Sequence, residues 1–149
     1  MSTRVPMGRV TVHLDSNPKD KAIASIIGEY EERVRSRGIS VQFSEKRDSD
    51  DYESELSNLS GNLVLLDERG ISMTSKEMAS WLHSAQLDSN TTNIAVGPHD
   101  GFSKEIMKLA DQMISLSSLT LTHEMAGALL MEQLYRASEI NRGSAYHRN

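Results

Sequence analysis

The run Leu63-Val64-Leu65-Leu66 constrains the fold of this chain more than any other stretch. Four consecutive apolar residues leave no polar face, which is typical of a central strand covered on both sides of its sheet. Helices must then connect the strands and cover both faces. The run therefore predicts an α/β fold with a mostly parallel, five- to six-stranded sheet flanked by helices.

The other segments supply strands and helices that alternate along the chain, as such a sheet requires. Strand patterns occupy residues 9–14, 39–43, 94–96 and 114–116, and helical spacing occupies residues 23–34, part of 44–61, 74–85, 103–110 and 122–143. Asn17 and Pro18 are expected to open the first helix and Gly38 to close it. Thr74 and Glu77 have the spacing of a capping box. We expect one domain spanning residues 1–149.

Ligands of parallel α/β sheets bind outside the carboxyl ends of the strands. In this sequence the predicted strands end at Asp15, Asp67, Gly97 and Ser117, with residues 67–70 expected as a loop. Small residues follow two of these ends, so we expect a ligand pocket there.

Composition excludes several classes of protein. The chain of 149 residues has no cysteine, which excludes disulfides, thiolate metal sites and cysteine nucleophiles. No apolar run approaches the ~20 residues of a membrane helix, and the segment MSTRVPMGRV lacks the apolar core of a signal peptide, so we expect a cytoplasmic location. The net charge of −5 hides a mildly basic segment in residues 1–47, which leaves an anionic partner such as RNA open.

Common catalytic motifs are missing from the sequence. It contains no G-x-S-x-G, H-E-x-x-H, P-loop or G-x-G-x-x-G motif, we expect no metal site, and His13 and His83 are expected at the surface. A receiver-like signalling or binding module would use acids such as Asp15 and Asp67, but it also needs a lysine where Ser117 and Ser118 stand. This alternative is therefore disfavoured, although the strand count allows it.

Five short motifs follow one another between residues 63 and 148: Leu66-Asp67-Glu68-Arg69-Gly70, the loop from Val96-Gly97 to Gly101, Ser115-Leu116-Ser117-Ser118-Leu119-Thr120, Glu132-Gln133-Leu134-Tyr135-Arg136-Ala137 and Gly143-Ser144-Ala145-Tyr146-His147-Arg148. In this order they resemble the ribosomal RNA large subunit methyltransferase H family of SPOUT-class enzymes. The resemblance implies a trefoil-knotted fold and a homodimer with its cofactor pockets at the subunit interface. It also implies methyl transfer from S-adenosylmethionine to N3 of a pseudouridine in 23S rRNA of the assembled ribosome.

The resemblance also assigns residues to roles. The cofactor would lie against the backbone of Leu66, Gly97, Leu116, Ser117, Ser118, Leu119, Thr120 and Leu121. Tyr146, His147 and Arg148 are the candidate catalytic residues, with His147 as a base or orienting group and Arg148 as a holder of a phosphate or oxyanion. The alternative for these three is a solvated C-terminal tail. Arg136 and Arg142 are candidate RNA contacts, and a solvated helix arginine is the alternative for Arg136.

Three residues depart from the pattern of that family. Pro98 stands where a second glycine is usual, and it removes a main-chain N–H donor. Thr122 replaces a proline, and Gly127 replaces an arginine four residues after His123. A divergent SPOUT paralogue with another RNA target or weak activity is therefore an alternative to the rRNA enzyme.

Overall fold

The computed structural model describes residues 8–44, 49–98 and 100–143. Its elements follow the order β1 (Val10–Leu14), α1 (Lys21–Val34), the 3₁₀ turn η1 (Arg35–Arg37), β2 (Ile39–Phe43), α2 (Ser49–Ser57), β3 (Asn62–Ser72), α3 (Ser75–Leu87), β4 (Thr92–Val96), α4 (Lys104–Leu109), β5 (Gln112–Ser115) and α5 (His123–Asn141). All strand pairs are parallel, and the sheet has the order β2-β1-β4-β3-β5. The predicted α/β class is confirmed.

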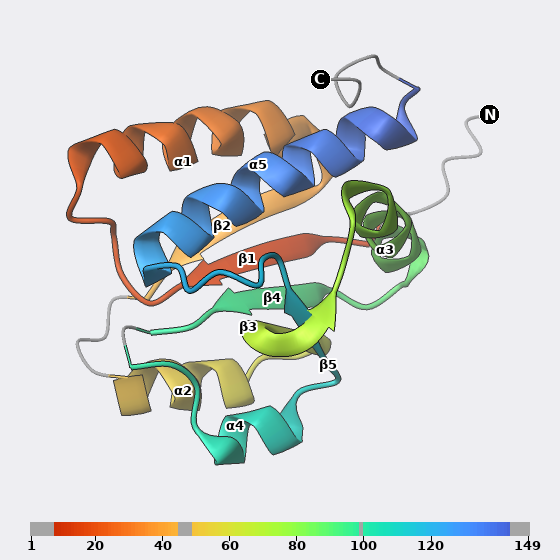
Figure 1. Cartoon of the computed structure of the whole chain (residues 1–149). Helices are drawn as coiled ribbons and strands as arrows, with labels where there is room; N and C mark the ends of the chain where they lie inside the picture. The colour runs from red at the N-terminus through yellow and green to blue at the C-terminus, as the bar shows by residue number, and fades with distance from the viewer. Residues whose placement is uncertain (1–7, 45–48, 99, 144–149) are drawn as a thin grey trace.

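Helices cover both faces of this sheet (Figure 1). The central run of β3 divides its side chains between two cores: Val64 and Leu66 pack in the core with α1, α3 and α5, whereas Leu63 and Leu65 pack with α2 and α4. All four residues are buried, which explains why the run has no polar position. Among the described residues, no helix combines the length and the hydropathy that crossing a membrane requires.

The strand order excludes the receiver-like alternative. A receiver sheet has the order 2-1-3-4-5, in which the strands carrying its acidic residues are neighbours. Here β4 lies between β1 and β3, so Asp15 and Asp67 follow strands that do not pair. The receiver interpretation is therefore wrong, while the trefoil knot implied by the resemblance stays a prediction.

Element boundaries differ from the sequence-based predictions in several places. Asp20, not Asn17 or Pro18, caps α1, because its carboxylate accepts from the N–H groups of Ala22 and Ile23 at 2.9 and 3.1 Å. Gly38 has φ 77° and closes the 3₁₀ turn that follows α1. Residues 67–70 belong to β3 rather than to a loop, and β5 ends at Ser115, one residue before Leu116.

The two histidines singled out from the sequence have different environments. His83 is exposed, as predicted, but His13 is only 7% exposed, so its surface assignment was wrong. Its Nε2 lies 2.9 Å from Oδ1 of Asn93, whose amide nitrogen donates to the carbonyl of Ser60. Because the amide group donates through its nitrogen, His13 carries its proton on Nε2. Burial lowers the pKa of His13 from its usual value.

Candidate functional site

A cavity of about 290 Å³ lies beside residues 66–68 of β3, at the carboxyl ends of β4 and β5 and the start of α5. Because β3 lies between β4 and β5, residues 66–68 and the segments after β4 and β5 meet at one edge of the sheet. The lining residues are Leu66, Asp67, Glu68, Val96, Gly97, Pro98, Asp100, Gly101, Ser115, Leu116, Ser117, Leu119, Thr120, Leu121, His123 and Ala126. The position matches the general rule for ligands of parallel sheets.

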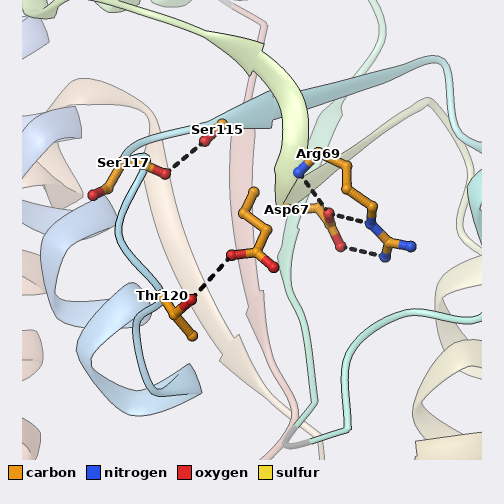
Figure 2. Close-up of polar contacts among 6 residues, drawn as sticks. Asp67, Arg69, Ser115, Ser117 and Thr120 are labelled. Carbon is orange, nitrogen blue, oxygen red and sulfur yellow. Dashed lines mark hydrogen bonds and ion pairs between the residues drawn. The ribbon is translucent and has the colours of Figure 1, made fainter.

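The first wall of the cavity is a bulge in β3. Leu66 and Ile71 both pair with Ile114, so residues 67–70 are an insertion in the β3–β5 ladder. Asp67 braces the bulge: its carboxylate accepts from the backbone N–H of Arg69 at 2.9 Å and from the guanidinium at 2.8 Å (Figure 2). These hydrogen bonds lower the pKa of Asp67. Glycine is required at position 70, because a Cβ there would lie 2.6 Å from the backbone nitrogen of Ile114.

The second wall is the segment between β5 and α5. Its turn is held by local bonds. The Ser115 hydroxyl donates to the Ser117 carbonyl at 2.9 Å (Figure 2), and the Leu119 N–H donates to the Ser117 hydroxyl at 2.9 Å. Thr120 then reaches across to the first wall, where its hydroxyl donates to Glu68 at 3.4 Å. Leu119 is 72% exposed at the rim.

The third wall is the turn after β4. The N–H of Gly101 donates to the carbonyl of Pro98 at 2.8 Å, and Gly101 has φ 79°, a conformation that favours glycine. A Cβ on Gly97 would lie 3.3 Å from the ring of Phe102, so a side chain there would press on the buried ring below. Pro98 is buried in this turn, and it offers a carbonyl but no N–H.

The charged groups around the cavity are mostly acidic. Asp67, Glu68 and Asp100 line it with His123, and no lysine or arginine is found among the described lining residues. His123 opens α5, and its Nε2 lies 4.0 Å from Oδ1 of Asp15 at the end of β1. Burial raises the pKa of Asp15, and the nearby imidazole partly offsets this shift. The arrangement suits a cationic or neutral ligand better than a phosphate.

Seven of the eight residues predicted to contact the cofactor line this one cavity, and Ser118 is the exception. Their role in holding a cofactor stays a prediction. Arg136 bonds Glu132 at 3.0 Å, and it lies 13 residues beyond His123 on α5, about 20 Å along the helix axis. Arg142 is farther still, so the structure does not bring either arginine to the cavity of its own chain. Tyr146, His147 and Arg148 lie outside the described residues.

Glu68, Asp100, His123 and Ala126 also line the cavity, although the sequence analysis gave them no role. The signal for Glu68 was its place in the motif of residues 66–70. His123 could have been found from its position at the start of the last helix, directly after the loop of residues 116–121. Within the part of the chain that the structure describes, no group of three or more acidic or histidine side chains could hold a metal ion.

Two departures from the family pattern now have structural explanations. Thr122 is the N-cap of α5, since its hydroxyl accepts from the N–H of Met125 at 3.2 Å. Gly127 is buried, and a Cβ on it would point to Leu14 and Ile27 rather than into the cavity, at 3.1 and 3.6 Å from their nearest methyl carbons. The absence of a side chain at position 127 therefore lets α5 pack closely on β1 and α1.

Comparison with known proteins agrees with this geometry. A family model described as "Predicted SPOUT methyltransferase" matches residues 9–147. The chain belongs to the SPOUT methyltransferase family. The ribosomal RNA large subunit methyltransferase H of Koribacter versatilis is 38% identical over 135 residues, which cover 87% of this chain and 90% of that protein. The protein of the same name from Geobacter sp. (strain M21) is 47% identical over 89 residues, or 58% of this chain and 57% of its own.

Solved structures share the fold of this SPOUT chain at low sequence identity. A probable methylase family protein from Haemophilus influenzae matches with a TM-score of 0.57 and 14% identity, over 91% of this chain and 67% of that one. TrmJ from Z. mobilis matches with a TM-score of 0.54 and 10% identity, over 87% of this chain and 69% of that one. At such identities the likeness establishes the fold alone.

Proposed function

We propose that this chain is an S-adenosylmethionine-dependent methyltransferase that modifies N3 of a pseudouridine in 23S rRNA of the assembled ribosome, in the cytoplasm. The observation that carries the proposal is the convergence of the β3 bulge and the segments after β4 and β5 on one cavity of about 290 Å³. The relative from Koribacter versatilis, which is 38% identical over most of both chains, bears the name of an rRNA methyltransferase.

The residues of the cavity suit S-adenosylmethionine in two ways. Leu66, Val96 and Leu116 give the cavity an apolar lining, and main-chain groups of the segments around it could hydrogen-bond the edge of an adenine ring. The acidic lining and the lack of a described cation suit a positively charged donor, and they disfavour the phosphates of NAD or ATP. When bound, the cofactor supplies an electrophilic methyl group.

The protein must then align the target base and assist loss of its N3 proton. We assign this role to Tyr146, His147 and Arg148, with His147 accepting the proton or orienting the uracil edge. Arg148 would stabilise a phosphate or a developing negative charge. Arg136, on the second half of α5, and Arg142, directly after its last residue, would contact RNA.

Chain length supports a homodimer with composite sites. The cavity adjoins the first turn of α5, a helix of 19 residues that is about 28 Å long. His147 is four residues beyond Gly143, a separation that spans at most about 14 Å even when fully extended. We therefore assign His147 to the cavity of a partner subunit.

Two measurements test the proposal. Calorimetry should detect S-adenosylmethionine binding in the micromolar range, and labelled methyl groups should be transferred to ribosomes that lack the modification, at a pseudouridine identified by mapping the product. Absence of binding at millimolar ligand would refute the proposal. Truncation of Tyr146, His147 or Arg148 should abolish transfer and spare cofactor binding, whereas equal loss of both would assign the tail a structural role.

A divergent SPOUT paralogue remains the second candidate, and Pro98 favours it. Its ring removes an N–H donor from a turn that lines the cavity. Transfer to another RNA, with none to unmodified ribosomes, would select this candidate.

A further inference from the structure

The mechanism above gives no role to Glu68, although this residue has an unusual position. It sits in the β3 bulge, lines the cavity, and accepts a hydrogen bond from Thr120 on the opposite wall. This hydrogen bond joins the β3 bulge to the loop before α5. Glu68 is thus an exposed acidic side chain of the cavity lining, where it can act on a bound ligand.

Glu68 supplies most of the net negative charge on this wall of the cavity, because the other acid of the wall is paired with an arginine. Asp67 is paired with Arg69 through Nε, Nη2 and the backbone N–H, so the negative charge of Asp67 is largely balanced. Asp100 lies on the turn after β4, on another wall of the cavity. The hydrogen bond to Thr120 orients the Glu68 carboxylate, but it adds no positive charge.

We propose that the Glu68 carboxylate makes the cavity selective for the charged methyl donor over the neutral product, S-adenosylhomocysteine. The inference rests on the proposed function. In methyl transfer the S–CH₃ bond breaks as the N–CH₃ bond forms, sulfur keeps the electron pair, and the N3 proton leaves to a base. The sulfonium thus becomes a neutral thioether, and its attraction to a nearby carboxylate is lost. Glu68 would therefore retain the donor and favour release of the product.

The expected effect of Glu68 on the affinity for the donor depends on how far this side chain is exposed to water. Glu68 is exposed, so water screens its charge, and an attraction over several ångströms is worth only about 5- to 10-fold in affinity. Replacement of Glu68 by glutamine removes the charge but keeps an oxygen that can accept from Thr120. The substitution therefore separates the electrostatic role from the bridging role.

The experiment measures the affinities of S-adenosylmethionine and S-adenosylhomocysteine by calorimetry for four proteins. Glu68→Gln should weaken binding of the donor about 5- to 10-fold and change binding of the product less than about twofold. Thr120→Val, which breaks the bridge and keeps the charge, should change both affinities by the same factor. Asp100→Asn removes a carboxylate from another wall of the cavity, and it should change the ratio of the two affinities less than Glu68→Gln does.

The possible failures can be told apart. If the native protein binds neither ligand, the proposed function fails. If it binds both and Glu68→Gln leaves their ratio unchanged, the inference about Glu68 is overturned while the function stands. An equal change of the ratio in Asp100→Asn would assign selectivity to the general field of the cavity and would also overturn the role of Glu68.

Discussion

Replacement of Gly127 by alanine tests how α5 packs against the rest of the protein. Position 127 is where the family pattern has an arginine, and the structure directs it into the interior beside Leu14 and Ile27. Alanine adds a single methyl group at this contact. A second glycine, Gly28 in α1, provides the matched control, because it is exposed and a Cβ on it would meet nothing within 4 Å.

Both substitutions gain about 1 kcal/mol of helix propensity, since glycine is unfavourable inside a helix by that amount. At Gly28 nothing opposes the gain, so the free energy of unfolding should rise by about 1 kcal/mol. At Gly127 the new methyl would lie 3.1 Å from Cδ2 of Leu14, which is nearly fully buried and must move by a few tenths of an ångström. Overpacking of a core costs about 1–3 kcal/mol, so Gly127→Ala should be neutral or destabilising by up to about 2 kcal/mol.

Urea denaturation of the three proteins at one protein concentration measures these free energies, and the fixed concentration removes any effect of subunit association. The difference between the two variants isolates the packing cost and should be about 1–3 kcal/mol. Gly127→Arg should lose more than Gly127→Ala, because it introduces a long charged side chain into the same contact. If Gly127→Ala gained as much as Gly28→Ala, the close approach of α5 to β1 would be refuted.

Two further predictions concern the buried polar groups beneath the site. The Tyr52 hydroxyl lies 2.7 and 3.0 Å from the carbonyl oxygens of Val96 and His13, and it is buried between α2 and the sheet. Tyr52→Phe should therefore lower the free energy of unfolding, measured by urea denaturation, by about 1–2 kcal/mol and leave the m-value unchanged. The buried His13 has a pKa below its usual 6.5, although Asn93 and the charge of Glu55 oppose the shift. The unfolded chain therefore binds more protons than the folded protein, and the free energy of unfolding should fall as the pH drops through about 6.5. His13→Gln should flatten this part of the stability–pH curve. An unchanged slope would show that other groups cause the pH dependence.

Local patterns predicted the elements of this fold well because each element carries its own signal. The apolar run of residues 63–66 is a strand buried on both faces, and the capping box of Thr74 and Glu77 opens α3 with both reciprocal bonds in place. Predictions failed where long-range contacts decided the outcome. The side chain of His13 points to the face of the sheet opposite Val12 and Leu14. That face would be exposed to solvent without a covering helix, but α2 packs on it. The extension of β3 through residues 67–70 depends on pairing with β5, 48 residues away in the chain for the Val64–Gln112 pair.

The site required the same long-range information. The residues of each turn could be named from the sequence, but their convergence depends on the strand order, and no local pattern determines that β3 lies between β4 and β5. Family resemblance grouped eight residues as contacts of one ligand, and seven of them line one cavity, while their role in binding a cofactor stays a prediction. It did not indicate that position 127 faces the interior, since a resemblance aligns residues without giving the direction of their side chains.

A cavity built largely from main-chain turns has a consequence for how this protein can diverge. Backbone groups persist when side chains change, so the turns at Leu66, Gly97 and Ser117 can keep their shape if the few residues that determine their conformation remain. Gly70 is such a residue, since any side chain there would collide with β5. Pro98 and Gly127 do not belong to this set. Pro98 sits in a turn whose backbone conformation a proline can adopt, and Gly127 lies where α5 packs on its neighbours, not in the cavity. We therefore expect changes in ligand preference to arise from side chains at the rim, such as Glu68 in the role proposed above, without alteration of the backbone around the cavity.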